Sequence, residues 1–318
     1  MTNRECFKKA LKREPFLGRV PHFELAFYLT METLGKVHPS HRSYSQWNQM
    51  SKAEQQLHME DLSDLYIETA RRFHHSAILV SQDPGGVENI RRLLEMIHEK
   101  TNGEYSLMLH GDVTPAIPNG SNMMEFAVMM HEQPGLIKQH TEERIVFAVR
   151  KAEALAKYGL LDGFALCADY CFNANPFYSA EAFADLVAPY LARIIRHYHD
   201  CGYYAIKHTD GNIMPILDQL VQCNPDALHS LDPQGGVDMG EVKCLYGDRV
   251  TLIGNVNCGL LQTGTDEECD ADVRRSLKQG MEGGTGYIFS TSNCVYTGMP
   301  LERYQRMHDI WYSEGIWK

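Results

Sequence analysis

The residues of this sequence most able to do chemistry stand in one short stretch, Tyr203–Asn212. His208 and Asp210 are two positions apart, so on a β-strand their side chains point to the same side. Gly211 then permits a sharp turn, and apolar residues at helical spacing predict a helix over 213–223. A strand that ends in two metal-capable side chains and leads into a helix is typical of α/β enzymes, which present their chemistry at the carboxyl ends of strands.

Polar side chains also follow most of the other predicted strands. They are Glu24, Asp83, His110 with Asp112, Asp169, Asp232, Asn255 with Asn257, and Cys294. If the strands form a barrel, these positions converge at one mouth from distant parts of the chain.

The elements that must position these residues alternate along the chain. Besides the strand that opens the 203–212 stretch, strands are predicted over 20–25, 77–80, 105–109, 163–167, 227–231, 250–254 and 287–289, with helices between them. Alternation of strand and helix implies parallel pairing, and eight units favour a closed (β/α)8 TIM barrel over an open sheet. No GxGxxG or GxxxxGK[ST] motif follows a strand. We expect one domain over 1–318, with 26–54 as a loop or lid after the first strand.

Composition excludes several classes of protein. The net charge of −11 argues against a nucleic-acid binder, and no apolar run is long enough to predict a membrane span. The charged start is unlike a secretory signal. The nine cysteines are scattered and odd in number, which favours reduced thiols in a cytoplasm over a disulfide framework. A homodimer is compatible with the sequence.

Four of the residues at strand ends could bind a divalent metal: His208, Asp210, Asp232 and Cys294. Zinc accepts imidazole, carboxylate and thiolate ligands, and a catalytic zinc keeps one position open. The alternative is that each has a structural role, since a lone histidine is usually a hydrogen-bonded core residue and a lone cysteine a small apolar one. Asp112 and Asp169 could likewise cap the helices that follow them.

Several motifs carry a resemblance to a known family. They include Asp169-Tyr170 with Pro176–Ser179, the run His208–Asn212, Asp232-Pro233, Gly254–Asn257, and Gly283–Tyr287 leading to Cys294. In these motifs the chain resembles the uroporphyrinogen decarboxylase-like superfamily, most specifically after residue 160. The resemblance implies a (β/α)8 barrel and one of two chemistries.

The first implied chemistry is decarboxylation of uroporphyrinogen. That enzyme lines its cleft with arginines supplied by a segment after the first strand. The corresponding segment here, residues 21–29, contains no arginine. An acidic or aromatic lining cannot pair with a polycarboxylate, so this function is the less favoured one.

The second implied chemistry is methyl transfer to or from a corrinoid carried on a partner protein. The resemblance implies zinc held by a His-x-Cys pair and a late cysteine; this chain has His208 and Cys294 but Asp210 in place of the first thiolate. A carboxylate makes the metal a harder Lewis acid, which suits the oxygen of a methoxy group better than a thiol. We therefore predict a zinc-dependent methyltransferase that demethylates a small, methoxylated aromatic substrate. A barrel that binds a corrinoid protein or a ligand without catalysis is the alternative of another class.

The remaining roles are assigned around that reaction. Asp210, Asp169 and Glu24 are the predicted catalytic residues, and Glu24 could also replace Asp210 or Asp232 as a metal ligand. The predicted substrate-binding residues are Tyr28, Asp112, Phe177 and Asn255. The aromatic members either line a pocket for a ring or are ordinary packing residues.

Overall fold

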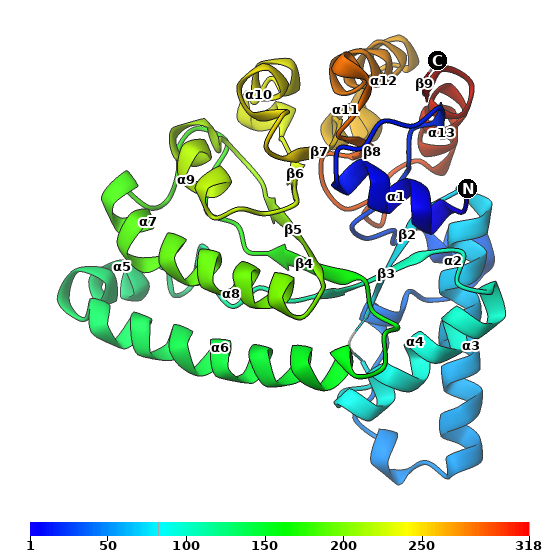
Figure 1. Ribbon diagram of the computed structural model, residues 1–318, viewed down its shortest axis with the longest axis horizontal. Coiled ribbons are helices and arrows are strands. Elements are labelled where there is room, and N and C mark those ends of the chain that lie inside the picture. Colours follow the sequence, from blue (N-terminus) through cyan, green and yellow to red (C-terminus); the bar gives the residue numbers. More distant parts are fainter. Residues whose placement is uncertain (82, 318) are drawn as a thin grey trace.

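Parallel strands form the centre of the protein in a computed structural model that describes residues 1–81 and 83–317 (Figure 1). In this part of the chain seven strands pair in parallel, each with the next along the sequence. They are β2 (Ala77–Val80), β3 (Ser106–His110), β4 (Gly163–Cys167), β5 (Tyr204–Thr209), β6 (Ala227–Ser230), β7 (Thr251–Val256) and β8 (Tyr287–Thr291). The predicted alternation of strand and helix is confirmed.

The first predicted strand, 20–25, joins the two edges of this curled sheet. His22 forms parallel bridges with both His75, beside β2, and Phe289 of β8. Ser76 N donates to His22 O at 2.6 Å, and Phe23 N donates to Phe289 O at 3.0 Å. Pro21 has no N–H to add to a ladder, so the pairing stays short. The predicted (β/α)8 barrel is therefore confirmed, with its first strand reduced to a bridge.

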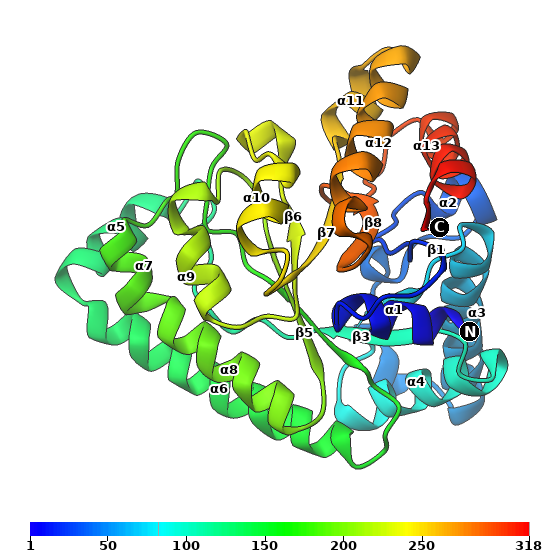
Figure 2. The same ribbon diagram turned by 45° about the horizontal axis from the view of Figure 1, so that its top comes forward.

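Helices surround the sheet. The longer ones are α3 (Lys52–Arg72), α4 (Val87–Thr101), α6 (Pro134–Ala156), α8 (Ala188–Asp200), α12 (Asp266–Gly280) and α13 (Leu301–Glu314). Shorter ones are α2 (Thr30–Leu34), α5 (Met123–Glu132), α7 (Ala180–Leu186), α9 (Leu217–Gln222), α10 (Met239–Tyr246) and α11 (Cys258–Thr263). Helices α6 and α8 run side by side along one flank, and α12 packs against α13 (Figures 1 and 2). The helical stretch between β4 and β5 is divided into α7 and α8, because Val187 leaves the helical conformation and a proline occupies the first turn of α8.

Helix α1 (Asn3–Leu11) closes the end of the barrel at which the strands begin. Its Phe7, Ala10 and Leu11 are buried in one cluster with inward-facing strand residues such as Met108 and Ile206. Thr251, the first residue of β7, donates its hydroxyl to Ala10 O at 2.7 Å. Because α1 closes this end, we expect the functional site at the end of the barrel where the strands finish.

The inward-facing positions at that other end carry polar side chains. Side chains alternate along a strand, so a residue two positions after an inward-facing core residue also faces inward. One such residue is found in each of β3 to β6. These residues are His110, Cys167, His208 and His229. Four neighbouring strands thus place three histidines and a cysteine in one layer.

The segment 26–54 contains α2 and two short 3₁₀ helices, η1 (Pro39–His41) and η2 (Trp47–Gln49), before α3 begins at a capping box formed by Ser51 and Glu54. Its role as a lid stays a prediction. Elsewhere, β1 (Gly18–Arg19) pairs antiparallel with β9 (Ile316–Trp317), outside the barrel. Within the described residues, none of the helices has the length and apolar character needed to cross a bilayer.

Candidate metal centre

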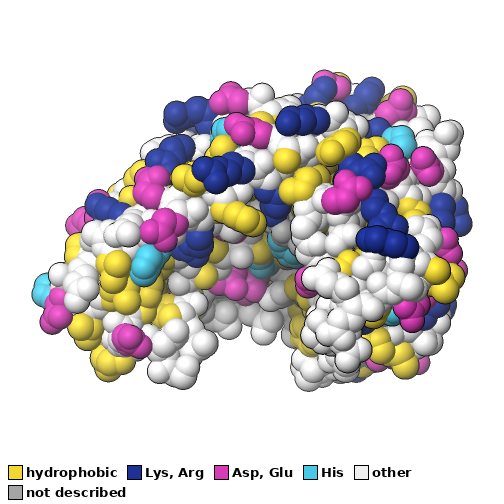
Figure 3. All heavy atoms as spheres, turned by 90° about the horizontal axis from the view of Figure 1, so that it is seen from below, with side chains coloured by type: hydrophobic (Ala, Val, Ile, Leu, Met, Phe, Trp, Pro, Cys, Tyr) yellow, Lys and Arg dark blue, Asp and Glu magenta, His cyan; other side chains and the backbone are white. Residues whose placement is uncertain are grey.

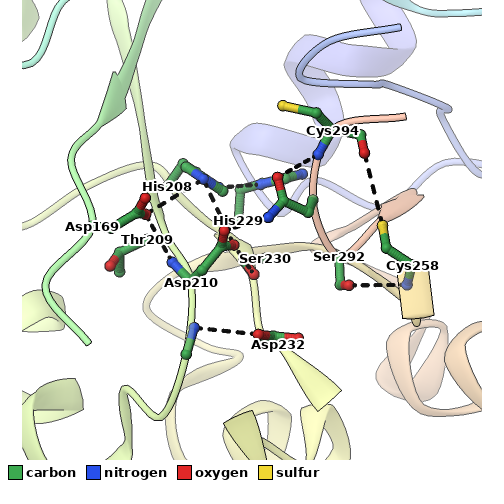
Figure 4. A network of polar contacts seen from close by, with 12 residues as sticks. Asp169, His208, Thr209, Asp210, His229, Ser230, Asp232, Cys258, Ser292 and Cys294 are labelled. Carbon is green, nitrogen blue, oxygen red and sulfur yellow. Dashed lines mark hydrogen bonds and ion pairs between the residues drawn. The ribbon is translucent and has the colours of Figure 1, made fainter. Parts of the chain in front are cut away.

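Asp169, His208 and Asp210 form a compact group at the mouth of the barrel (Figure 4). His208 Nε2 lies 3.7 Å from Asp169 Oδ1 and 3.7 Å from Asp210 Oδ1, and one potential ligand atom from each residue lies within 4.8 Å of the others. Ligand atoms around a tetrahedral zinc are about 3.3 Å apart, given bonds of about 2 Å. Small side-chain movements would therefore bring the three residues onto one ion.

The pairing register of β4 and β5, together with a glycine turn after β5, brings these three residues to the barrel mouth. β4 and β5 pair Cys167 with His208, so Asp169 follows β4 at the level of Asp210. Asp210 N donates to Asp169 Oδ1 at 3.1 Å. Gly211 makes the next turn with φ of 77°, and a Cβ there would lie 2.6 Å from a backbone carbonyl oxygen. The turn that presents Asp210 therefore requires glycine.

A buried hydrogen-bond chain runs from His208 into the protein. His208 Nδ1 lies 2.7 Å from His229 Nδ1, and His229 Nε2 lies 3.2 Å from Ser290 Oγ. The Ser290 hydroxyl donates to Glu24 Oε2 at 3.2 Å. Figure 4 shows the two imidazoles in contact, with His208 between His229 and Asp169.

The direction of this chain fixes the tautomer of His208. Ser290 donates its hydroxyl hydrogen to Glu24 Oε2, so its oxygen accepts from the Nε2–H of His229. His229 then carries a lone pair on Nδ1 and accepts from the Nδ1–H of His208. The remaining nitrogen of His208, Nε2, therefore presents a lone pair toward Asp169 and Asp210. A neutral imidazole held in this way by its second nitrogen is the form that ligates metals.

The electrostatics of the group also fit a cation. Burial, and then the charge of Asp169, raise the pKa of Asp210 to about 7. Burial lowers the pKa of His208 to about 4, against the opposing effect of Asp169. A neutral imidazole and two close carboxylates leave negative charge with no cation among them, and a bound divalent ion would offset it. Two carboxylates and an imidazole are compatible with zinc.

Two of the predicted ligands lie outside this group. Asp232 accepts from Gln234 N at 3.0 Å, capping η4 (Pro233–Gly235), and from Gly211 N at 3.3 Å. Cys294 accepts at its carbonyl oxygen from the Cys258 thiol, and its own sulfur points away from Cys258 (Figure 4). Burial, and then the charge of Asp210, raise the pKa of the Cys294 thiol to about 12. Cys294 thus lies within electrostatic reach of the carboxylates as a neutral thiol.

The predicted catalytic residue Glu24 is buried in a network of donors. Besides Ser290, it accepts from the hydroxyls of Thr291 at 2.6 Å and Tyr304 at 3.1 Å, and His22 Nε2 lies 3.1 Å away. Glu24 therefore reaches the metal centre through the histidine chain and makes no direct contact with it.

The predicted substrate-binding residues are dispersed. Asp112 pairs with the fully buried Lys207 at 2.7 Å. Asn255 is fully buried and bonds Leu231 O and Arg275, away from the group. Tyr28 stacks on a histidine of η1 and lines a small cavity of about 50 Å³ that also contacts Glu24. Phe177 packs in an aromatic cluster with Phe126, Phe172 and Tyr178.

Sequence reasoning missed His229, Ser290 and Lys207. His229 stands in a predicted buried strand next to the His208 strand, and the observed register is what places the two residues side by side. Lys207 is a charged residue inside an apolar strand, which by itself indicates a buried partner.

On the molecular surface, acidic and histidine side chains lie at the base of a hollow between two lobes (Figure 3).

The chain is similar to several known proteins. A family model described as "Uroporphyrinogen decarboxylase (URO-D)" matches residues 116–313. A search of curated proteins gave no match. A solved methyltransferase from Methanosarcina mazei is similar over 98% of this chain and 99% of that chain, with a TM-score of 0.73 and 17% identity. GH5_18 proteins from Bifidobacterium longum subsp. infantis and Streptomyces cattleya have TM-scores of 0.52 and 0.53 at 11% and 10% identity, covering 95% and 93% of this chain and 80% and 82% of theirs. These structural likenesses show the fold alone.

Proposed function

The chain belongs to the uroporphyrinogen decarboxylase family, and on that premise we propose that it is a methyltransferase. It would transfer the methyl group of a small methoxylated aromatic compound to the Co(I) form of a corrinoid carried by a partner protein, which breaks the bond between oxygen and methyl and yields a phenolate and a methyl-Co(III) corrinoid. The observation that carries the proposal is the group Asp169, His208 and Asp210 at the barrel mouth. The similarity in fold to a methyltransferase over nearly the whole of both chains supports it.

Zinc is the proposed metal, held by His208 Nε2 and by oxygens of Asp169 and Asp210. Bound there, it would supply Lewis acidity toward the ether oxygen of the substrate. His229 orients the imidazole of His208. Ser230 donates to Asp210 Oδ1 at 2.7 Å, and Asn293 donates to Oδ2. These donors hold the carboxylate in place, as the outer partners of metal ligands do.

The other predicted residues act around that centre in this proposal. Glu24 is a positioning residue, because it sets the direction of the hydrogen-bond chain to His208. Tyr28 keeps its proton, since burial raises the pKa of its hydroxyl, and it can donate to a substrate oxygen. Cys294 also keeps its proton. It therefore either lines the site as a neutral thiol or becomes a ligand when the metal binds. Asp232 supports the turn at Gly211 by accepting a hydrogen bond from its N–H.

Decarboxylation of uroporphyrinogen is the second candidate, because the matching family bears that enzyme's name. The first-strand segment, residues 21–29, contains no arginine to pair with the substrate's carboxylates. A non-catalytic binding barrel would lack turnover with any donor. Metal analysis and an assay of methyl transfer to cob(I)alamin distinguish both alternatives from a methyltransferase.

Metal analysis of the purified protein tests the site directly. We expect stoichiometric zinc in the wild type and in the exposed-histidine control His131→Ala, and its loss in His208→Ala, because a site of three ligands rarely survives the loss of one. Full zinc retention by His208→Ala would show that the ligand set is wrong.

Incubation with cob(I)alamin tests the reaction. Formation of methylcobalamin from aryl methyl ethers, followed by its absorbance, is the expected result. Turnover of methylamines or methyl thioethers alone would refute the preference for oxygen. Loss of carboxylates from uroporphyrinogen, with no methyl transfer from any donor, would favour the decarboxylase.

A further inference from the structure

Asp169 differs from the other two members of the metal centre in how its side chain is held. Ser230 donates to Oδ1 of Asp210 at 2.7 Å, and Asn293 donates to its Oδ2. The imidazole of His208 is held by the buried histidine chain. The Asp169 carboxylate faces His208 (Figure 4), is half exposed, and accepts from the Asp210 N–H at 3.1 Å. The direction in which Asp169 presents its oxygens therefore depends chiefly on the backbone that carries it.

The peptide groups on both sides of Asp169 are fixed by hydrogen bonds. The carbonyl oxygen of the preceding residue accepts from Lys207 Nζ at 3.0 Å. In the following peptide group, Asp169 O accepts from Ile117 N at 2.8 Å, and Tyr170 N donates to Thr209 Oγ1 at 3.0 Å. Because each peptide group is planar, fixing both of them fixes φ and ψ of Asp169 and the direction of its Cβ.

The ammonium group of Lys207 has a fixed position behind this segment. Lys207 is fully buried, and its ammonium donates to Asp112 Oδ2 at 2.7 Å, to Leu166 O at 3.2 Å and to Ala168 O at 3.0 Å. Three acceptors match the three hydrogens of an ammonium group. The nitrogen also lies 4.1 Å from the centroid of the Tyr170 ring. Lys207 therefore contacts the chain immediately before and immediately after Asp169.

A buried network joins these contacts into a closed circuit. Asp112 Oδ1 accepts from the Thr114 N–H at 2.9 Å and from the Thr114 hydroxyl at 2.6 Å. Since Thr114 donates its hydroxyl hydrogen to Asp112, its oxygen accepts from the hydroxyl of Tyr170 at 2.5 Å. The circuit runs from Lys207 through Asp112 and Thr114 to Tyr170 and back to Lys207. Because Asp112 compensates the charge of Lys207, the pair acts on Asp169 through geometry.

We propose that Lys207 is a positioning residue of the metal centre, which directs the carboxylate of Asp169 toward the place between His208 and Asp210. Neighbouring residues of a strand point to opposite faces, so β5 supplies a ligand on its inner face and the support of a second ligand on its outer face. Without Lys207 the peptide group before Asp169 is free to rotate, and its half-exposed carboxylate turns toward water. This inference rests on the proposed metal centre.

Titration of the metal-free protein with Co(II), followed by visible absorption, tests this role without any turnover. The main variant combines Lys207→Met with Asp112→Asn, which removes the buried pair and leaves the net charge unchanged. We expect a loss of Co(II) affinity of about tenfold or more, as for other outer partners of metal ligands. The absorption spectrum of the bound Co(II) should also change, because the spectrum follows the arrangement of the ligands.

A matched control separates positioning from general stability. Arg4→Met with Asp162→Asn removes an ion pair of 2.8 Å at the opposite end of the barrel, again without a change in net charge. This control should keep the wild-type spectrum and an affinity within about twofold of wild type, as expected for a distant site. An equal loss in the control would show that metal affinity merely follows stability, and would overturn the proposal.

A second variant acts on the same segment from its other side. Thr209→Val keeps the shape of the side chain and removes the acceptor of the Tyr170 N–H. We expect it to weaken Co(II) binding by about fivefold, the factor that corresponds to one hydrogen bond. It decides the question alone if the Lys207 and Asp112 double variant is unfolded by circular dichroism.

Wild-type affinity and an unchanged Co(II) spectrum in the folded double variant, or in Thr209→Val where the double variant does not fold, would overturn the proposal. Failure of the proposed function would look different. A wild-type protein that binds no metal would reject the metal centre together with this inference. Metal affinity that depends on Lys207, without methylcobalamin formation from any donor, would reject methyl transfer and leave the positioning role standing.

Discussion

Acid should destabilise this fold through its buried neutral histidines, two of which lie where the first segment closes the barrel. His22 contacts His75 with ring centroids 4.8 Å apart and lies 6.0 Å from His308 of α13. Burial, and then the charge of His22, lower the pKa of His75 well below 6.5 and that of His308 to about 4. His38, packed on Tyr28, also has a pKa lowered to about 4, mainly by burial.

The sign and size of the effect follow from proton linkage. Below pH 6.5 the unfolded chain protonates these histidines while the folded protein keeps them neutral, so the unfolded state binds more protons and stability falls as the pH falls. Between pH 8 and pH 5.5, each such histidine removes about 1.4 kcal/mol from the free energy of unfolding. The three together remove about 4 kcal/mol, a large part of a typical stability of roughly 5–15 kcal/mol.

Urea unfolding at several pH values, followed by circular dichroism, measures this loss. With an m-value of about 3 kcal/mol/M, the midpoint should fall by a little over 1 M between pH 8 and pH 5.5. His308→Gln should flatten the pH dependence by about one histidine's share, whereas the exposed control His131→Gln should not change it. A midpoint that does not move with pH, or a slope unchanged by His308→Gln, would refute the claim that these side chains are neutral in the fold.

Three further predictions concern the supports of the site. Lys207→Met leaves Asp112 buried without its partner and should cost roughly 3–5 kcal/mol in thermal or chemical unfolding; adding Asp112→Asn should recover part of that loss. Gly211→Ala should lower stability and metal content more than Gly236→Ala, because both glycines have positive φ but only at Gly211 does a Cβ meet the backbone; equal effects would contradict the crowding argument. Tyr304→Phe removes a donor to Glu24 and should cost about 1–3 kcal/mol of stability, and an unchanged melting temperature would count against that buried network.

The sequence allowed the barrel and part of the site to be predicted, for a physical reason. Buried parallel strands are short apolar runs, and the residues after them converge in any closed barrel, so His208, Asp210 and Asp169 could be placed at one mouth without coordinates. Membership of the family and the fold were predicted correctly from the motifs after residue 160.

Other features depend on three-dimensional detail that no spacing carries. The contact between His208 and His229 requires the register of two strands. Asn255 is fully buried and its side chain accepts from Arg275 of α12, whereas strand alternation alone predicted a place at the mouth.

The closing segment also has a consequence for the order of events during synthesis. His22 forms its bridge with Phe289 of β8, which is synthesised more than 260 residues later. Strand β1 likewise pairs with β9, so this pairing can form only after the end of the chain has been synthesised. Local strand–helix–strand units can form as they leave the ribosome, whereas this first segment has no partner on one side until the end of the barrel exists. We therefore expect nascent chains that stop before β8 to keep an unpaired edge of the sheet and to be cleaved by proteases near residue 20. Such chains should depend on chaperones until β8 is present and the barrel can close.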